Sequence, residues 1–246
     1  MMHRFYCPHP DSGRLDPSES HHARSVLRVK AGDRCTVFDG RGKELQAEVT
    51  EVGKHQLCFS VVSSHQSKPL PFSIHLVQAL TKGRSWSLIL EKSTELGVSS
   101  ISPVLSDRSV TRIGAEDTVK HEKWRQEIIT ACKQSGRNYL PRLSPVTRIE
   151  KLTDPSLTQY TPKFIASLQP DALPLKLALE RVMESELQQD ITIAVGPEGD
   201  FSPAELGQFR AMGYQPVSLG PNVLRAETAA IYLCAVLFYE MQHRFA

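Results

Sequence analysis

Apolar and polar residues alternate along the first part of the chain, up to about residue 70. Leu45, Ala47 and Val49 recur at every second position, which is the spacing of a strand with one buried face. This pattern predicts strands over Cys35–Asp39, Glu44–Val52 and Gln56–Val62, a glycine-rich hairpin turn over Asp39–Lys43, a helix over His21–Val29 and a linker over Ser63–Pro71. Residues 1–70 are therefore expected to form a small β domain.

From Phe72 onward, short apolar runs alternate with stretches that have the 3.6-residue period of helices. Strands are expected over Ile74–Leu80, Val98–Leu105, Lys163–Leu168, Ile191–Val195 and Pro216–Leu219, and helices over Ser85–Leu96, Glu116–Ser135, Leu175–Leu187, Ala204–Met212 and Thr228–Arg244. Strands separated by helices favour a mostly parallel sheet with helices on both faces. Residues 71–246 are expected to form an α/β domain.

The last of these helices is apolar nearly all round between Ala229 and Tyr239. Such a helix is buried on more than one side. The surface that covers it is either the rest of its own domain or a second subunit, and the sequence leaves both open.

Composition narrows the class of protein. A hydrophobic share of 40% and a charged share of 23% are ordinary for a soluble globular chain. No apolar run reaches the roughly 20 residues that a membrane span needs, and no apolar segment follows Met1 as in a secretory signal. The five cysteines are scattered without the spacing of a disulfide framework or a zinc site. We therefore expect a cytoplasmic protein that contacts no membrane and holds no metal.

Charge is unevenly distributed along the chain. Lys and Arg exceed Asp and Glu up to residue 151, and the balance reverses from residue 152 onward. A basic front beside an acidic tail is compatible with a polyanionic partner that meets one face of the molecule. Ordinary solvated surfaces would explain the same distribution.

Two Gly-Pro turns dominate the last part of the chain, in Val195–Ser202 and in Leu219–Ala230. Each follows a short apolar run and leads into a helical pattern, so each lies at the carboxyl end of an expected strand, where α/β proteins build ligand sites. The chain lacks GxxxxGK[ST], GxGxxG, GxSxG and HExxH motifs. Leu168, Leu219 and Leu224 supply apolar walls, which suit an adenine ring better than a pyrophosphate.

These turns, with Arg225-Ala226-Glu227-Thr228 attached, resemble the SPOUT methyltransferases and, more narrowly, the bacterial 16S ribosomal RNA uracil-N3 methyltransferases. Supporting stretches are Met2–Phe5, His22–Arg28, Phe38–Gly42, Ala79–Gly83, Glu91–Val98, Ser106–Ser109, Gln134–Arg137 and Pro141. Relatives usually have glycine where Asp200 stands and often threonine where Ala226 stands. Asp200 either places a carboxylate near the cofactor or faces solvent.

The resemblance implies a PUA-like β-barrel for RNA, followed by an α/β domain whose carboxyl-terminal part forms a trefoil knot. It also implies S-adenosylmethionine as cofactor, a homodimer with its site near the subunit interface, and 16S rRNA of the small ribosomal subunit as substrate. Two alternatives stay open. One is a non-catalytic RNA-binding or ribosome-assembly protein, and the other is a SPOUT enzyme that acts on another base or on a ribose 2′-hydroxyl.

Candidate residues fall into three groups. Arg225 and Glu227 are the catalytic candidates: a cation just past the cofactor loop would stabilise charge on the uracil oxygens, and Glu227 either holds Arg225 or caps the last helix. The expected cofactor-binding residues are Leu168, Gln169, Gly196, Pro197, Glu198, Gly199, Leu219, Gly220, Asn222, Leu224, Arg225, Thr228 and Ala229. The candidates for contacts with RNA phosphates are Arg4, Arg24, Arg28, Arg41, Lys43, Lys82, Arg84, Arg108 and Arg137. No histidine lies near these motifs, so no general base is assigned.

Overall fold

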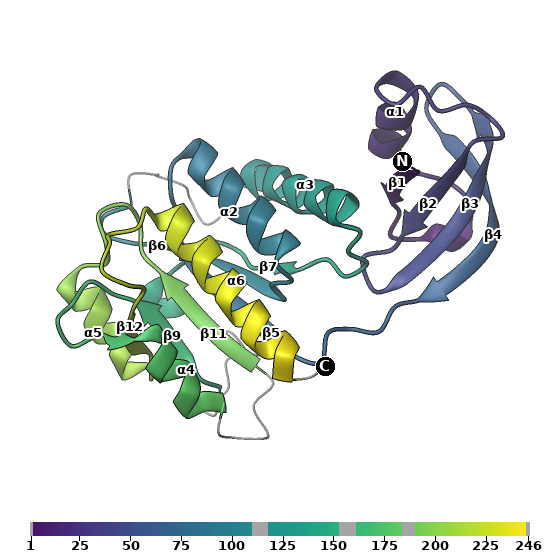
Figure 1. Ribbon diagram of the computed structural model, residues 1–246. Helices are drawn as coiled ribbons and strands as arrows, with labels where there is room; N and C mark the ends of the chain where they lie inside the picture. Colours follow the sequence, from purple (N-terminus) through teal and green to yellow (C-terminus); the bar gives the residue numbers. More distant parts are fainter. Residues whose placement is uncertain (1, 110–117, 153–160, 184–189, 245–246) are drawn as a thin grey trace. The chain divides into compact units, whose positions relative to one another are not determined.

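The computed structural model describes residues 2–109, 118–152, 161–183 and 190–244 (Figure 1). The chain divides into two compact units. The N-terminal unit contains Met1–Leu70 together with Ile129–Leu140, and the C-terminal unit contains Pro71–Ile128 together with Pro141–Ala246. The break at Leu70 coincides with the end of the expected β domain, whereas Ile129–Leu140 joins that domain from a distant part of the sequence.

The N-terminal unit is built on one four-stranded sheet. Its elements are β1 (His3–Tyr6), the 3-10 turn η1 (Pro10–Ser12), α1 (Pro17–Ser25), β2 (Arg34–Phe38), β3 (Lys43–Val52) and β4 (Leu57–Gln66). The strand order is β1-β2-β3-β4, in which β1 and β2 are parallel and the other pairs are antiparallel. Alternate residues of β3, Leu45, Ala47 and Val49, are buried in the core of this unit, as the period of two predicted.

Two expectations for this unit were wrong in detail, and one strand was missed. The helix spans Pro17–Ser25 rather than His21–Val29, because the Asp16 carboxylate caps it by accepting a hydrogen bond of 2.8 Å from the Glu19 N–H. Ser63–Gln66 is not linker but the end of β4, paired with Lys43–Gln46 of β3. Strand β1 was not foreseen, since four residues are too few to show a period.

The C-terminal unit contains a parallel sheet. Its elements are β5 (Ser73–Ala79), α2 (Gly83–Glu95), β6 (Ser100–Leu105), α3 (Thr118–Ser135, shared with the N-terminal unit), β7 (Arg142–Leu143), β8 (Thr147–Arg148), the 3-10 turn η2 (Ile149–Lys151), β9 (Lys163–Ala166), β10 (Leu173–Pro174), α4 (Leu175–Met183), β11 (Asp190–Val195), α5 (Pro203–Ala211), β12 (Gln215–Ser218) and α6 (Ala226–Arg244). The strand order is β10-β12-β9-β11-β5-β6-β7, with β8 also paired to β6. Every strand pair of this sheet among the described residues is parallel, which confirms the predicted α/β fold.

Helices cover the middle strands of this sheet. Figure 1 shows α6 running across β5 and β11 with α2 beside it. Phe201, just before α5, packs together with Leu206 and Phe209 of that helix against Val77 and Ala194 of those strands, in a separate buried cluster. Among the described helices, none is both long and apolar enough to cross a bilayer.

Most expected elements of this unit are found within a few residues of their predicted ends. Parts of two expected helices, residues 116–117 and 184–187, lie outside the described residues. Strands β7, β8 and β10 were missed because each is only two residues long, too short for any periodic pattern.

Candidate active site

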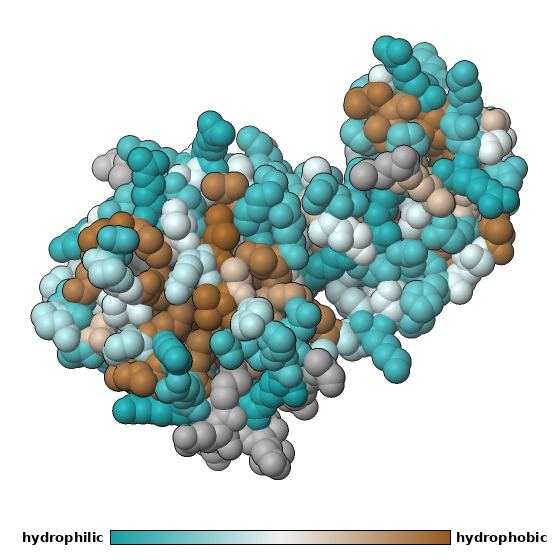
Figure 2. Space-filling model, in the orientation of Figure 1, coloured by the Kyte–Doolittle hydropathy of each residue, from teal (hydrophilic) through white to brown (hydrophobic). Residues whose placement is uncertain are grey.

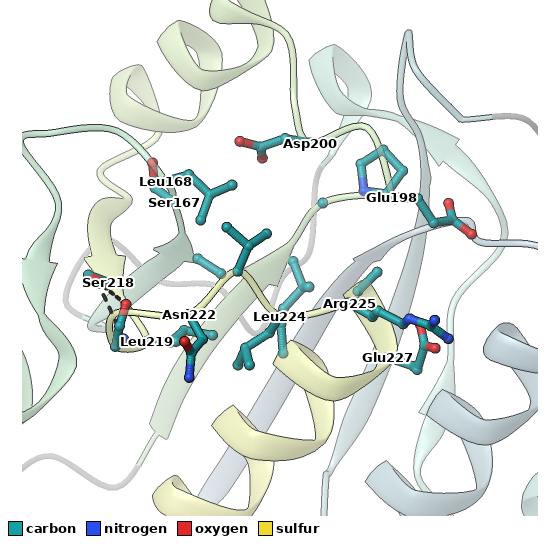
Figure 3. Close-up of a pocket in the computed structure, with 18 of the residues that line it drawn as sticks. Ser167, Leu168, Glu198, Asp200, Ser218, Leu219, Asn222, Leu224, Arg225 and Glu227 are labelled. Atoms are coloured by element: carbon teal, nitrogen blue, oxygen red, sulfur yellow. Dashed lines mark hydrogen bonds between the residues drawn. The ribbon is translucent and has the colours of Figure 1, made fainter.

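A pocket of about 450 Å³ lies at the carboxyl ends of β9, β11 and β12 (Figure 3). Three loops line it, through residues 166–168, 195–200 and 218–229, and Ser85 from the first turn of α2 completes the wall. Parallel strands place their following loops at one edge of the sheet, so loops distant in sequence meet there. The two Gly-Pro turns and the loop after Ala166 are thus brought together as predicted.

The first Gly-Pro turn is tightly packed around Gly196. A Cβ there would lie 3.2 Å from Asp200 Oδ1 and 3.3 Å from the Phe201 backbone nitrogen. Beneath the turn, the fully buried Gln78 amide donates to the carbonyl oxygens of Val195 and Gly196, at 3.3 and 3.4 Å. The buried Gln78 side chain therefore holds the backbone of this loop from the side of the sheet, and Val195 and Gly196 also line the pocket.

Asp200 has a left-handed backbone, with φ of +59°. This explains why glycine suits the position, since a left-handed conformation costs an L-residue about 1–2 kcal/mol. Here the Asp200 carboxylate offsets part of that cost by accepting a hydrogen bond of 2.7 Å from the Phe201 N–H.

Substitutions at Asp200 should separate backbone strain from the lost hydrogen bond. We expect Asp200→Gly to leave the free energy of unfolding within about 0.5 kcal/mol, because the relieved strain offsets the lost contact. Asp200→Ala keeps the strain and loses the contact, and is expected to cost about 1 kcal/mol. Urea unfolding followed by circular dichroism measures both; equal losses for Gly and Ala would contradict the assignment of strain.

The second Gly-Pro turn presents bare backbone. Gly220 has φ of +124°, and no atom lies within 4 Å of the place where its Cβ would be. Its N–H donates to the Ser218 hydroxyl at 3.4 Å, which closes the turn. The chain then leads to Arg225, whose carbonyl accepts the Ala229 N–H at 2.8 Å and so makes the first hydrogen bond of α6.

The pocket has an apolar part and a charged part. Leu168, Leu219 and Leu224 come from two different loops, and Leu168 is 62% exposed at the rim. In the view of Figure 3, the side chains of Arg225 and Glu227 project together from the start of α6, on the side opposite Leu168. One wall therefore suits a flat apolar ring, whereas the other offers a cation and a carboxylate.

Most of the expected cofactor-binding residues line this pocket, together with both catalytic candidates. These are Leu168, Gly196, Pro197, Glu198, Leu219, Gly220, Asn222, Leu224, Arg225, Glu227 and Ala229. Gln169, Gly199 and Thr228 are not among the lining residues. The lining residues that carried no assignment are Ser85, Ala166, Ser167, Val195, Ser218, Val223 and Ala226, and Asp200 lines the pocket as well. All of these except Ser85 lie in or next to the two Gly-Pro turns and the loop after β9. Ser85 lies in α2, and nothing in the sequence around it indicates that this helix reaches the pocket.

Arg4, an expected RNA contact, is used within the N-terminal unit. Its guanidinium donates to Glu44 at 2.8 Å and to the Asn138 side chain, and it lies 4.6 Å from the centre of the Phe38 ring. Burial alone would raise the pKa of Glu44, but the hydrogen bonds from Arg4 and Asn138 bring it below its ordinary value. Only 13% of the Arg4 side chain is exposed. Its contacts with Glu44 and Asn138 connect β1 to β3 and to the loop after α3.

The other candidate cations of the N-terminal unit differ in exposure. Arg28 and Arg41 are exposed, whereas Arg137 is half-buried and burial lowers its pKa. Arg24 and Arg41 donate to the backbone carbonyls of Lys54 and Pro8, and Lys43 pairs with Asp11 at 2.6 Å. In the C-terminal unit, Lys82, Arg84 and Arg108 are exposed beside the pocket loops. The Lys82 N–H donates to Glu198 at 3.4 Å, and the Arg108 side chain donates to the Gly199 carbonyl at 2.8 Å.

Three of the cysteine thiols are buried and hard to ionise. All five cysteines are free, and burial raises the pKa of Cys35 and Cys132 to about 11 and that of Cys234 to about 12. These three thiols therefore stay protonated at neutral pH. Within the described ranges, no cluster of three or more His, Cys, Asp or Glu side chains could hold a metal ion.

Comparison with known proteins gives two family matches. Residues 68–238 match a family described as the RNA methyltransferase domain, and residues 15–62 match the RNA methyltransferase PUA domain. Together the two matches cover most of both units.

Individual relatives agree with these matches. Ribosomal RNA small subunit methyltransferase E of Synechocystis is 32% identical over 221 residues, which are 87% of this chain and 69% of the relative. The crystal structure of the enzyme of that name from Neisseria gonorrhoeae, bound to S-adenosyl methionine, is 32% identical with a TM-score of 0.85, covering 96% of this chain and 97% of the other. A methyltransferase from Legionella pneumophila in complex with the cofactor SAM is 31% identical, with a TM-score of 0.84 and 98% coverage of both chains. The chain therefore belongs to the RNA methyltransferase family, among the relatives of ribosomal RNA small subunit methyltransferase E.

Proposed function

We propose that this protein is an S-adenosylmethionine-dependent methyltransferase that methylates N3 of a uridine in 16S ribosomal RNA. The observation that carries the proposal is the pocket at the carboxyl ends of β9, β11 and β12, with Arg225 at its charged side. The chain's family membership and its relatives solved with bound S-adenosyl methionine support the same assignment.

The residues that line the pocket fit this cofactor. Leu168, Leu219 and Leu224 offer apolar surface to an adenine ring, and the bare backbone at Gly220 allows a ligand to approach closely. The Asp200 carboxylate also lines the pocket and suits the positive charge of an ammonium or sulfonium group. When bound, S-adenosylmethionine supplies a methyl group activated by a sulfonium centre.

The chain's own task is to present uracil as an anion at N3. The N3 lone pair is delocalised into both carbonyl groups, so the imide proton must pass to solvent before nitrogen can act as a nucleophile. Negative charge then develops on the uracil oxygens, and the Arg225 guanidinium is placed to stabilise it by hydrogen bonding. Glu227, two residues further along at the start of α6, orients that guanidinium in this proposal. The pocket walls hold the two reactants in line.

A paired uridine hides its N3 edge, so the substrate base must be unpaired or flipped out. Lys82, Arg84 and Arg108 are the exposed cations beside the pocket loops, and we assign them to RNA phosphates. The match of residues 15–62 to an RNA methyltransferase PUA domain supports a second contact with RNA through the N-terminal unit. Because phosphate contacts release counterions, RNA binding should weaken steeply as salt rises.

We also propose a homodimer that associates through α6. Tyr232 and Tyr239 are 42% and 61% exposed on this helix, and Val236 is half-buried between them. Figure 2 shows apolar residues gathered along the face of the C-terminal unit where α6 lies. A contiguous apolar surface of this kind marks an interaction site in many soluble proteins. The trefoil knot, the assembled small subunit as substrate and the cytoplasmic location stay predictions.

Two measurements test the proposed function. Titration of S-adenosylmethionine into the folded protein should release or absorb heat with a Kd on the order of micromolar, about 8 kcal/mol of binding free energy. Incubation with unmodified small subunits or 16S rRNA should then transfer a labelled methyl group, and digestion to nucleosides should give 3-methyluridine. A silent titration rejects the proposal, a 2′-O-methyl product replaces it with ribose methylation, and binding without transfer supports a non-catalytic RNA-binding protein.

A further inference from the structure

Glu205 connects two loops of the C-terminal unit that are about a hundred residues apart in sequence. Its carboxylate oxygen Oε1 accepts a hydrogen bond of 2.9 Å from the Asp107 N–H. The other oxygen, Oε2, accepts from the Ser202 N–H at 2.7 Å and from the Ser106 hydroxyl at 3.1 Å. Glu205 is 5% exposed, so a buried carboxylate is satisfied entirely by these two segments.

The connection goes beyond the ordinary role of this residue in a helix cap. Ser202 and Glu205 form a capping box at the start of α5, in which each side chain bonds the other's backbone N–H. A capping box needs only one oxygen of the glutamate. The remaining acceptor capacity is used by Ser106 and Asp107, at the end of β6.

Two further contacts join the same loops. The Ser202 hydroxyl donates to Asp107 Oδ2 at 3.0 Å, and the Arg108 guanidinium donates to the Gly199 carbonyl at 2.8 Å. A Cβ at Gly199 would lie 3.4 Å from the Cβ of Arg108, so the two backbones approach closely. The segment from Gly196 to Ser202 is thus fixed along one side by Ser106–Arg108.

Gly196, Glu198 and Asp200 on this segment line the pocket, whereas Glu205 and Asp107 do not. We infer that Glu205 is a positioning residue: its carboxylate, shared between Ser106–Asp107 and Ser202, sets the shape of the Gly196–Asp200 loop and thereby the affinity for the cofactor. The inference rests on the proposed function, and it assigns a role in the site to a residue outside the pocket.

Glu205→Gln separates this role from helix capping. The amide oxygen can replace Oε2 and still accept from Ser202 and Ser106, but the amide NH₂ then faces the Asp107 N–H, so two donors oppose each other. We expect the Kd for S-adenosylmethionine to rise about tenfold, because a charge-assisted hydrogen bond is lost. Hydrogen exchange at the Asp107 amide of the cofactor-free protein should accelerate, and KM for the cofactor should rise more than kcat falls.

Asp107→Ala provides a second variant that keeps the capping box intact. The Asp107 side chain is exposed, and its hydrogen bond among the described residues is the one from the Ser202 hydroxyl, so we expect a smaller rise in Kd, roughly fivefold. Two controls accompany these variants. Gln208→Glu exchanges an amide and a carboxylate at an exposed position of α5, and Asp16→Ala removes a helix cap in the N-terminal unit. Both should leave the Kd unchanged, although Asp16→Ala lowers the thermal midpoint.

The outcomes distinguish this inference from the proposed function. If the wild-type protein binds S-adenosylmethionine and both Glu205→Gln and Asp107→Ala bind it with unchanged Kd, the positioning role is wrong and the proposed function stands. If the wild-type protein does not bind the cofactor, the proposed function fails. In that case, acceleration of exchange at the Asp107 amide in Glu205→Gln still supports the connection between the loops, and unchanged exchange overturns it.

Discussion

Arg225→Ala is expected to lower kcat for methyl transfer about 100- to 1000-fold, the usual effect of removing one donor that stabilises a developing oxyanion. Arg225 lines the charged side of the pocket and precedes α6, where its backbone is fixed by the hydrogen bond to Ala229. Under the proposed function, removal of the guanidinium leaves the uracil anion without a charged partner. The rate of the variant should rise more steeply with pH than that of the wild type, since uracil must then ionise unaided. Single-turnover transfer of labelled methyl groups to 16S rRNA measures both effects.

Arg210→Ala is the matched control for this prediction. It removes the same charge from an exposed pair with Asp171 at 2.6 Å on α5, outside the pocket. Exposed ion pairs contribute little to stability, so kcat should stay within about twofold of wild type. Equal losses in Arg210→Ala and Arg225→Ala would mean that overall charge, rather than the position of Arg225, supports the reaction.

The pocket could be predicted from local sequence because its walls are continuous stretches. Each wall is a loop that directly follows a short apolar run, and parallel strands deliver such loops to one edge. Gly196 and Gly220 belong to Gly-Pro turns that are visible without any structure, and both line the pocket. The order of the strands was not predictable, since periodicity reports burial but not which strand lies beside which.

Contacts between distant segments could not be predicted from local sequence. Ser85 joins the pocket from α2, and Glu205 reaches Asp107 across 98 positions of the sequence. The sequence around Ser85 or Glu205 does not indicate which distant residues they contact. A capping box has the same sequence pattern whether or not its glutamate also bonds a second loop. The charge of a residue likewise does not indicate its partner. Arg4 was expected to contact RNA, yet its guanidinium donates to Glu44 and Asn138.

The segment Ile129–Leu140 shows how such a contact shapes the fold itself. Its residues continue the sequence of α3, yet they pack with the N-terminal unit. The Gly42 N–H donates to the Asn138 carbonyl at 3.0 Å, the Gly42 carbonyl accepts the Ser67 N–H at 2.9 Å, and the Tyr139 hydroxyl donates to the Ser67 carbonyl at 2.9 Å. A hairpin turn expected to present cations to RNA is therefore also a packing surface for a distant loop.

Gly42→Ala should consequently destabilise the N-terminal unit by about 3 kcal/mol. Gly42 has φ of +103°, which costs an alanine about 1–2 kcal/mol. The added Cβ would also overlap the Tyr139 ring, which its bond to Ser67 holds in place, and overpacking of this kind adds about 1–3 kcal/mol. Urea unfolding followed by circular dichroism measures the loss.

Gly32→Ala is the control for this prediction. Gly32 has φ of +88°, but no atom lies within 4 Å of the added Cβ. Only the backbone cost of about 1–2 kcal/mol therefore applies. If both variants lose the same stability, Tyr139 moves aside freely and does not lock the loop after α3 onto the hairpin.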